Sequence, residues 1–259
     1  MPSVIVEQRD RVLHMGLNRP AKRNAFNVEM LEELGRAYER LESDDNLRAG
    51  VLYAHGDNFT GGLDLAELGP RLIDGSVDWP ADARNPWRND GRPWTKPVVA
   101  AVHGLCLTLG IELLLAADIR IASADARFAQ LEVQRGIYPF GGATTRLPRE
   151  AGWGNAMRWL LTGDEFDAAE ALRIGLVQEV VEPGNQRDRA VDLAERIATR
   201  SAPLAVGTTL AAAQRAIREG ERAAEDRFVD DVVALFKTQD GAEGMLSFIE
   251  RRPARFVGA

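Results

Sequence analysis

The sequence predicts an α/β fold, in which short strands and helices alternate along most of the chain. Two observations favour this class. Apolar runs with strand-like composition alternate with segments of helical spacing as far as about residue 183. Beyond that point the apolar patterns all have helical spacing. We therefore expect an α/β body over residues 1–195 and a helical region over residues 196–259.

The expected strands are short runs rich in Val, Ile and Leu, bounded by turn residues. They cover residues 4–6, 12–17, 50–54, 97–102 and 119–122. The runs at 50–54 and 97–102 are apolar throughout, which is typical of strands that are buried on both faces.

The expected helices follow from apolar spacing and from capping residues. Asn27 can cap a helix from about Val28 to Leu41, where apolar side chains recur on one face. A second, strongly apolar helix begins near Leu109 and ends before Asp118. Four further helical segments fill the last part of the chain, at residues 187–200, 203–218, 221–237 and 241–250.

Composition excludes several classes of protein. The 259 residues carry 32 Lys and Arg against 39 Asp and Glu, and this net charge of −7 argues against nucleic acid as a partner. The single cysteine, Cys106, excludes a disulfide framework and fits a cytoplasmic location. We expect no metal site, because the three histidines are far apart in sequence. We see no secretory signal, and the apolar runs are too short for a membrane span.

Residues 69–95 do not follow the alternation of strands and helices. This segment is rich in Pro, Gly, Asp and Arg and contains Trp79, Trp87 and Trp94. It is expected to form a loop with short helices that makes one wall of a site. Its arginines, Arg84, Arg88 and Arg92, suggest contact with a polar or acidic group of a ligand.

Three other segments carry chemistry. In residues 58–65, two glycines precede Asp64, and backbone N–H groups of such a turn can face an anion; alternatively it is a plain strand-to-helix turn. In residues 103–113, Glu112 lies in the first turn of an apolar helix, where it has either a function or only a favourable interaction with the helix dipole. In residues 128–143, Glu132 is either functional or paired with Arg135 on the surface.

Together and in this order, these segments resemble the crotonase (enoyl-CoA hydratase/isomerase) family. Residues 18–26, Asn-Arg-Pro-Ala-Lys-Arg-Asn-Ala-Phe, are similar to the opening motif of that family. The resemblance continues through residues 96–104, 117–120 and 161–163, and ends with residues 243–256. It therefore covers nearly the whole chain.

The resemblance implies a crotonase-like spiral of ββα turns followed by a C-terminal helical trimerisation region. It further implies a homotrimer or homohexamer and an acyl-CoA thioester as substrate. It implies no cofactor, since coenzyme A is part of the substrate.

The resemblance also assigns site residues. Backbone N–H groups of Leu63 and Leu109 match the oxyanion hole, which stabilises the negative charge on a thioester oxygen. Glu112 and Glu132 match the paired catalytic glutamates, with Glu112 as the water-activating base and Glu132 as the proton-delivering acid. The residues matched to CoA binding are Lys22, Arg23, Ala25, Leu63, Asp64, Leu65 and Ala66.

The implied activity is that of an enoyl-CoA hydratase, which adds water across the 2-trans double bond of an acyl-CoA. Leu63 and Leu109 are bulkier than the residues common at these positions, and they reshape the acyl site. A first alternative is therefore an enoyl-CoA isomerase or another acyl-CoA reaction of the family. A second is a catalytically weak member that binds acyl-CoA or RNA.

Overall fold

The computed structural model describes residues 1–75, 79–92 and 94–259. Its main sheet has the strand order β1-β2-β3-β4-β6-β9. β1 is antiparallel to β2, and the remaining neighbours are parallel. The strands are β1 (Val4–Arg9), β2 (Val12–Leu17), β3 (Ala49–Ala54), β4 (Val98–Val102), β6 (Ile119–Ser123) and β9 (Glu179–Val181).

A second, smaller sheet lies beside the first and consists of β5 (Leu105–Leu107), β7 (Arg127–Ala129) and β8 (Phe166–Asp167). The chain passes from β4 in the main sheet to β5 through a sharp turn at Gly104. The φ of Gly104 is +54°, and a Cβ there would lie 2.0 Å from the Asp57 carbonyl oxygen, so glycine is required. The strand–turn–strand–helix order of β4, β5 and α3 (Leu109–Ala116) is the expected ββα unit.

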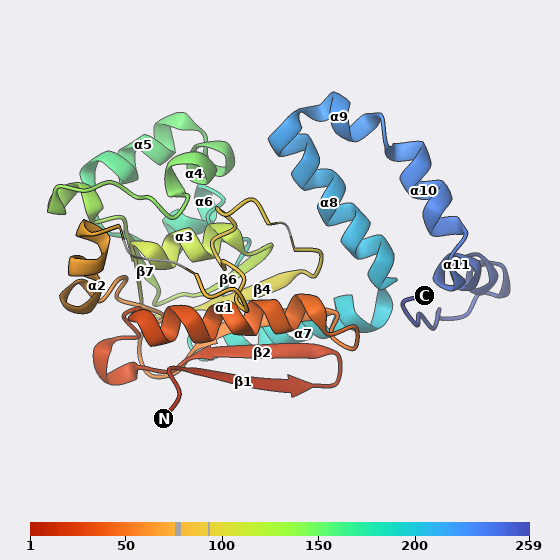
Figure 1. Cartoon of the computed structure of the whole chain (residues 1–259), viewed down its shortest axis with the longest axis horizontal. Coiled ribbons are helices and arrows are strands. Elements are labelled where there is room, and N and C mark those ends of the chain that lie inside the picture. The colour runs from red at the N-terminus through yellow and green to blue at the C-terminus, as the bar shows by residue number, and fades with distance from the viewer. Residues whose placement is uncertain (76–78, 93) are drawn as a thin grey trace.

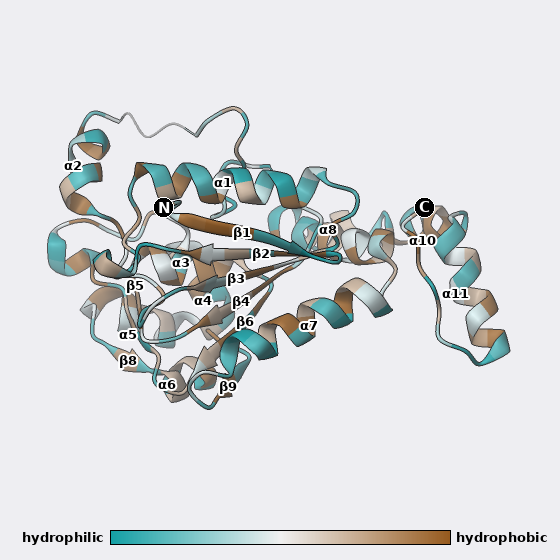
Figure 2. Cartoon of the chain, turned by 90° about the horizontal axis from the view of Figure 1, so that it is seen from below, coloured by the Kyte–Doolittle hydropathy of each residue, from teal (hydrophilic) through white to brown (hydrophobic). Residues whose placement is uncertain are grey.

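Helices cover both faces of the main sheet (Figure 2). α1 (Val28–Ser43) lies on one face, and the Asn27 side chain caps it by accepting from the Met30 N–H at 3.0 Å. α7 (Gln186–Arg200) lies on the other face, where Ala190, Ala194 and Ala198 form a buried stripe. Because these side chains are small, the helix can approach the sheet closely.

The remaining elements of the body are short helices. They are η1 (Pro20–Lys22), α2 (Leu65–Ile73), η2 (Glu132–Arg135), α4 (Ala143–Ala151), α5 (Trp153–Thr162) and α6 (Ala168–Arg173). Figure 1 shows α2, α4, α5 and α6 on the same side of the molecule as β7.

A helical arm extends from the body after α7 (Figure 1). It contains α8 (Pro203–Glu219), α9 (Glu221–Glu225), α10 (Phe228–Phe236) and α11 (Gln239–Glu250). The expected boundary at residue 195 lies within α7, and the chain leaves the body at the turn that follows this helix. In the described part of the chain, no helix is both long and apolar enough to cross a lipid bilayer.

The prediction of one helix over residues 221–237 is wrong, because α9 and α10 are separate. The break contains neither Gly nor Pro. The Arg227 N–H bonds to the Ala224 carbonyl, three residues back, and this tight turn redirects the chain. Ion pairs within the segment, such as that between Arg227 and Asp231, are equally compatible with a continuous helix.

Candidate active site

Glu112 is buried in α3, with 1% of its surface exposed. Its Oε1 accepts from the Ala143 N–H at 3.0 Å, at the N-terminus of α4. Burial raises the pKa of Glu112 to about 7, while backbone N–H groups of Ala143, Gly141 and Gly142 act in the opposite direction. Glycine at position 141 allows the loop to approach the carboxylate closely, since a Cβ there would lie 2.7 Å from Glu112 Oε2. The fold therefore provides Glu112 with donors that favour its ionised form.

Glu132 is in η2 and is 6% exposed. Its Oε2 is buried and accepts no hydrogen bond from the described residues. Burial, together with the negative charge of Glu112, raises the pKa of Glu132 to about 7, against the opposing effect of the Glu132 backbone N–H. The alternative of a surface ion pair with Arg135 is wrong, because Glu132 is buried and lines a pocket that Arg135 also lines.

Glu112 and Glu132 line the same pocket, which has a volume of about 220 Å³ and which we call the carboxyl pocket. Most of its other lining is apolar. The lining residues include Leu63, Leu65, Leu109, Leu131, Ile137 and Phe140. Two acidic groups in apolar surroundings, both with a pKa of about 7, are typical of acid–base chemistry at neutral pH.

Leu63 and Leu109 present unpaired backbone amides beside this pocket. Phe26 pairs with the residues on either side of Leu63. Its N–H donates to the Gly62 carbonyl at 2.8 Å, and its carbonyl accepts from the Asp64 N–H at 2.9 Å. The Leu63 N–H therefore points away from Phe26. Leu109 is the first residue of α3, where the N–H has no partner in the helix. Within the described residues, neither amide donates a hydrogen bond.

Thr108 precedes one of these amides and has an unusual backbone conformation, with φ +50° and ψ −116°. Such a conformation strains a β-branched residue. Gly62, which precedes the other amide, packs against Thr108 so closely that a Cβ on Gly62 would lie 2.0 Å from Thr108 Oγ1. The two amide-bearing segments are thus in direct contact. The sequence analysis did not select Thr108, although a β-branched residue between glycine-rich positions was an available signal.

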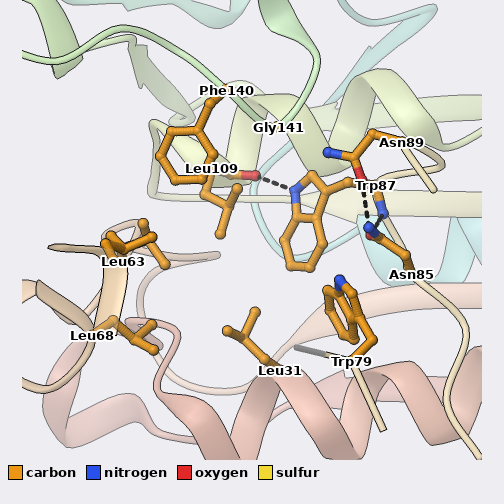
Figure 3. Close-up of a pocket in the computed structure, with 11 residues that line it drawn as sticks. Leu31, Leu63, Leu68, Trp79, Asn85, Trp87, Asn89, Leu109, Phe140 and Gly141 are labelled. Carbon is orange, nitrogen blue, oxygen red and sulfur yellow. Dashed lines mark hydrogen bonds between the residues drawn. The ribbon is translucent and has the colours of Figure 1, made fainter. Parts of the chain in front are cut away.

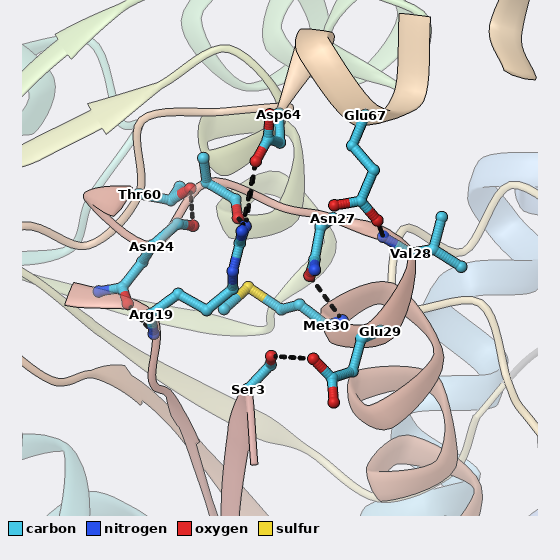
Figure 4. Close-up of polar contacts among 11 residues, drawn as sticks. Ser3, Arg19, Asn24, Asn27, Val28, Glu29, Met30, Thr60, Asp64 and Glu67 are labelled. Carbon is cyan, nitrogen blue, oxygen red and sulfur yellow. Dashed lines mark hydrogen bonds and ion pairs between the residues drawn. The ribbon is translucent and has the colours of Figure 1, made fainter. Parts of the chain in front are cut away.

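The residues expected to bind CoA lie around the entrance to α2. Lys22 and Arg23 are exposed at η1, and Ala25 follows them. Leu65 and Ala66 are exposed at the start of α2, and Leu65 also lines the carboxyl pocket. Asp64 does not cap α2 with its side chain; its carboxylate instead pairs with Arg19 at 3.3 Å (Figure 4).

Asn24, which lies in the opening motif, joins three loops and was not selected as a functional residue from the sequence. It is fully buried, its side-chain oxygen accepts from the Arg19 N–H, and its Nδ2 donates to the carbonyls of His55 and Asn58 at 2.8 Å. These bonds connect the loop of Lys22 and Arg23 to the segment that leads to Leu63.

A second cavity, of about 210 Å³, lies on the other side of Leu63, Leu109 and Phe140, which line both spaces (Figure 3). We call it the tryptophan pocket. Its remaining lining consists of Leu31, Leu68, Leu72, Trp79, Asn85, Trp87, Asn89 and Gly141. It is almost entirely apolar, with two asparagines at one side.

The expectation that residues 69–95 form a wall of the site is correct for Trp79 and Trp87 but wrong for Trp94. Trp94 packs on Tyr38, with ring centroids 4.8 Å apart, and is covered by Arg88. Residues 76–78 and 93 of this segment lie outside the described residues.

The expected ligand role for Arg84, Arg88 and Arg92 is also wrong. Arg84 and Arg92 pair with Glu39 of α1, at 3.3 and 2.9 Å. Arg88 pairs with Asp118 at 2.9 Å. These partners belong to the body, so the arginines attach the segment to the body and do not line either pocket.

The described residues contain no group of three or more His, Cys, Asp or Glu side chains that could hold a metal ion. Cys106 is a free, fully buried thiol, and burial raises its pKa well above the usual value.

Comparison with known proteins identifies the family. Residues 7–259 match the family model described as enoyl-CoA hydratase/isomerase. The enoyl-CoA hydratase EchA19 of Mycobacterium tuberculosis is 36% identical, covering 98% of this chain and 96% of the relative. The crotonyl-CoA hydratase of Syntrophomonas wolfei is 35% identical, covering 98% of each chain.

A solved structure of a probable enoyl-CoA hydratase/isomerase from Mycobacterium abscessus is 54% identical, with a TM-score of 0.97 over 99% of both chains. This similarity confirms the expected α/β body with a helical C-terminal region. The chain therefore belongs to the enoyl-CoA hydratase/isomerase family that its motifs resemble.

Proposed function

We propose that this protein is an enoyl-CoA hydratase that converts 2-trans-enoyl-CoA into 3-hydroxyacyl-CoA. The observation that carries the proposal is the pair of buried carboxyl groups, Glu112 and Glu132, in one pocket beside two unpaired amides. Relatives named as hydratases support the same activity. Addition of water is redox-neutral, so the proposed reaction requires no cofactor besides the CoA of the substrate. We propose a cytoplasmic location, with which the free thiol of Cys106 is compatible.

The amides of Leu63 and Leu109 would bind the thioester oxygen of the substrate. Negative charge develops on that oxygen when water attacks the β-carbon. Preorganised N–H donors stabilise this charge without reorganisation, and the dipole of α3 adds to the effect at Leu109.

The two carboxyl groups would have different roles. Glu112 accepts hydrogen bonds from backbone N–H groups, which favour the carboxylate, so it can take a proton from the attacking water. Glu132 has an unpartnered oxygen and is close enough to sense the charge of Glu112, so it holds a proton more readily. It can deliver that proton to the α-carbon as water oxygen bonds to the β-carbon.

CoA would approach past η1 and the start of α2. Lys22 and Arg23 are exposed cations in this loop and suit the phosphates of the nucleotide. Exposed Leu65 and Ala66 offer backbone and apolar surface to pantetheine, while the acyl group would extend past Leu63 and Leu109 toward the tryptophan pocket.

The direct test is loss of the ultraviolet absorbance of crotonyl-CoA, with 3-hydroxybutyryl-CoA identified as product. The same assay with a 3-enoyl-CoA tests the isomerase alternative, in which Leu63 and Leu109 of the carboxyl pocket would exclude the attacking water. Conversion of the 3-enoyl-CoA without hydration of crotonyl-CoA or a longer 2-enoyl-CoA would replace our proposal with isomerisation. Binding of acyl-CoA without either reaction would indicate a catalytically weak member.

Activity is expected to follow a bell-shaped pH profile with its maximum near neutral pH. Burial raises the pKa of both Glu112 and Glu132 to about 7, and their coupling means that the profile reports the pair. At lower pH both groups are protonated and the base is lost, whereas at higher pH both are ionised and the acid is lost. Measurement of kcat/KM across this range checks the prediction, and a rate independent of pH would contradict it.

Stability should also depend on these two groups. Both carboxyls have a folded-state pKa above the ordinary value of 4.5, so the folded protein retains protons that the unfolded chain releases. The free energy of unfolding should therefore fall as pH rises from about 4.5 through about 7. Denaturant titrations at several pH values give the free energy of unfolding of the wild type and of the Glu112→Gln/Glu132→Gln variant. An equal dependence of that free energy on pH in both proteins would contradict the prediction.

The helical arm supports the proposal of a homotrimer or homohexamer. α8 and α10 contain no buried residue in the single chain. Large apolar side chains of α10 and α11 are at least 40% exposed, among them Phe228, Val232, Phe236, Leu246, Phe248 and Ile249. Uncovered apolar surface of this kind is typical of subunit interfaces.

We expect ultracentrifugation to give a mass of three or six times the 28.4 kDa chain. Phe236→Asp should lower that mass, because a charge would be placed in the apolar interface. Leu161→Asp, at an exposed leucine of α5 in the body, is the matched control. A wild-type protein that remains monomeric at high concentration would contradict the proposal.

A further inference from the structure

Trp87 connects the tryptophan pocket to the backbone carbonyl of Leu109 (Figure 3). Its ring is buried, and its Nε1 donates to the Leu109 carbonyl oxygen at 3.0 Å. The ring packs edge-on against Phe26, with centroids 5.4 Å apart, and lies 6.0 Å from Trp79. The indole is thus held by two aromatic contacts as well as by a hydrogen bond.

The residue held by Trp87 follows the strained Thr108. The direction of the Leu109 N–H is set by ψ of Thr108 and φ of Leu109, and strained conformations persist only when neighbouring contacts determine them. The backbone of Thr108 is held by its N–H, which donates to the Ala129 carbonyl at 2.9 Å. The backbone of Leu109 is held by the hydrogen bond from Trp87, which lies outside α3.

Trp87 is itself anchored to the loop that binds Glu112. The backbone N–H of Trp87 donates to Asn85 Oδ1 at 2.9 Å, and the backbone carbonyl of Trp87 accepts from Arg146 Nη2 at 2.6 Å. The same guanidinium donates through Nη1 to the Gly141 carbonyl at 3.2 Å. Gly141 begins the run of backbone amides that face Glu112. One chain of hydrogen bonds therefore joins the donors around Glu112 to the backbone around Leu109.

We propose that Trp87 is a positioning residue that holds the Leu109 amide in the direction needed to bind the thioester oxygen. This inference rests on the proposed function, because it concerns the same oxyanion hole. It assigns Trp87 a role beyond lining the acyl site: the indole N–H acts on catalysis through the backbone, while the ring shapes the pocket. A ring that only lines the pocket would affect binding of the acyl group but not polarisation of its carbonyl.

The test is Trp87→Phe, which keeps an aromatic ring but removes the N–H donor. The readout is the absorbance of bound 2,4-hexadienoyl-CoA, which moves to longer wavelength when the thioester carbonyl is polarised. We expect the variant to lose most of this shift and to have a kcat lowered about tenfold with crotonyl-CoA, since small displacements of catalytic groups have large effects on rate. KM should change little.

Trp94→Phe is the matched control, because it makes the same change at a buried tryptophan that packs on Tyr38 and lines neither pocket. It should retain the wild-type absorbance shift. A folded Trp87→Phe protein with wild-type kcat and a wild-type shift would overturn the proposal.

If Trp87→Phe does not fold, Asn85→Ala decides the question, because it keeps the indole and removes the acceptor that fixes the Trp87 backbone. A partial loss of the shift would support the proposal, and an unchanged shift would overturn it. Because 2,4-hexadienoyl-CoA is itself a 2-enoyl-CoA, the shift is recorded directly after mixing, before hydration consumes the bound probe. A wild type that shifts the absorbance but hydrates no enoyl-CoA would refute the proposed function. The role of Trp87 would then be decided by comparing the absorbance shifts of the wild type and of Trp87→Phe.

Discussion

Glu132→Gln is expected to lower kcat for hydration by about 10²- to 10⁴-fold, the range typical of a lost general acid. Glutamine preserves the size of the side chain but has no proton that it can deliver to the α-carbon. The carboxyl group is 6% exposed and its Oε2 has no partner in the described chain, so solvent is poorly placed to replace it. The hydration rate with crotonyl-CoA measures the loss.

Glu112→Gln should have an effect of similar size, because glutamine is too weak a base to activate water. Binding of the CoA thioester should survive in both variants, since neither side chain is required for the contacts we propose around η1 and α2. Glu195→Gln, on the exposed surface of α7, is the matched control and should be unchanged. Near-normal turnover in both active-site variants would falsify the assigned roles.

Gly62→Ala is expected to damage both stability and catalysis. Gly62 has a φ of +92°, and an added Cβ would lie 2.0 Å from Thr108 Oγ1, so the two amide-bearing segments must separate. We expect a loss of about 1–3 kcal/mol from backbone strain. We also expect a fall in kcat of about 100-fold, because the amide of Leu63 would be displaced by a distance on the order of 1 Å. Thermal denaturation and the crotonyl-CoA assay measure the two effects.

The neighbouring substitution, Gly61→Ala, is the control, since its Cβ would meet nothing closer than the Arg23 Cβ at 3.6 Å. It should leave both stability and rate near wild type. Adding Thr108→Gly to Gly62→Ala removes the clashing hydroxyl and should restore part of the stability. If Gly62→Ala alone had the wild-type melting temperature and kcat, the close contact between the two segments would not matter to the enzyme.

Most of the fold could be predicted because its elements have local signals. Asn27 and the apolar face after it define α1, and uniformly apolar runs define β3 and β4. The break between α9 and α10 could not be predicted, since it depends on a tight turn at Asp226 and Arg227, where neither Gly nor Pro marks the end of a helix. The roles of Arg84, Arg88 and Arg92 could not be predicted either, because their partners Glu39 and Asp118 are distant in sequence.

Some residues of the candidate site could likewise be predicted from the sequence, and others could not. Glu112 and Glu132 could be selected because a carboxylate among apolar residues is conspicuous, and the family resemblance supplied the expected spacing. Thr108 and Asn24 were missed as site residues, and Trp87 was expected only as part of a wall of the site. The importance of Trp87 depends on a bond to a backbone carbonyl that is 22 residues away, and such a bond leaves no periodic pattern in the sequence.

The placement of the tryptophans gives the protein an intrinsic optical label. Two of the five, Trp79 and Trp87, line the cavity that we assign to the acyl group, whereas Trp153 is 73% exposed on α5. Entry of an acyl chain would replace water beside the two pocket indoles and change the polarity that governs their emission. Intrinsic fluorescence should therefore follow occupancy of this cavity during turnover, with Trp153 contributing a constant background.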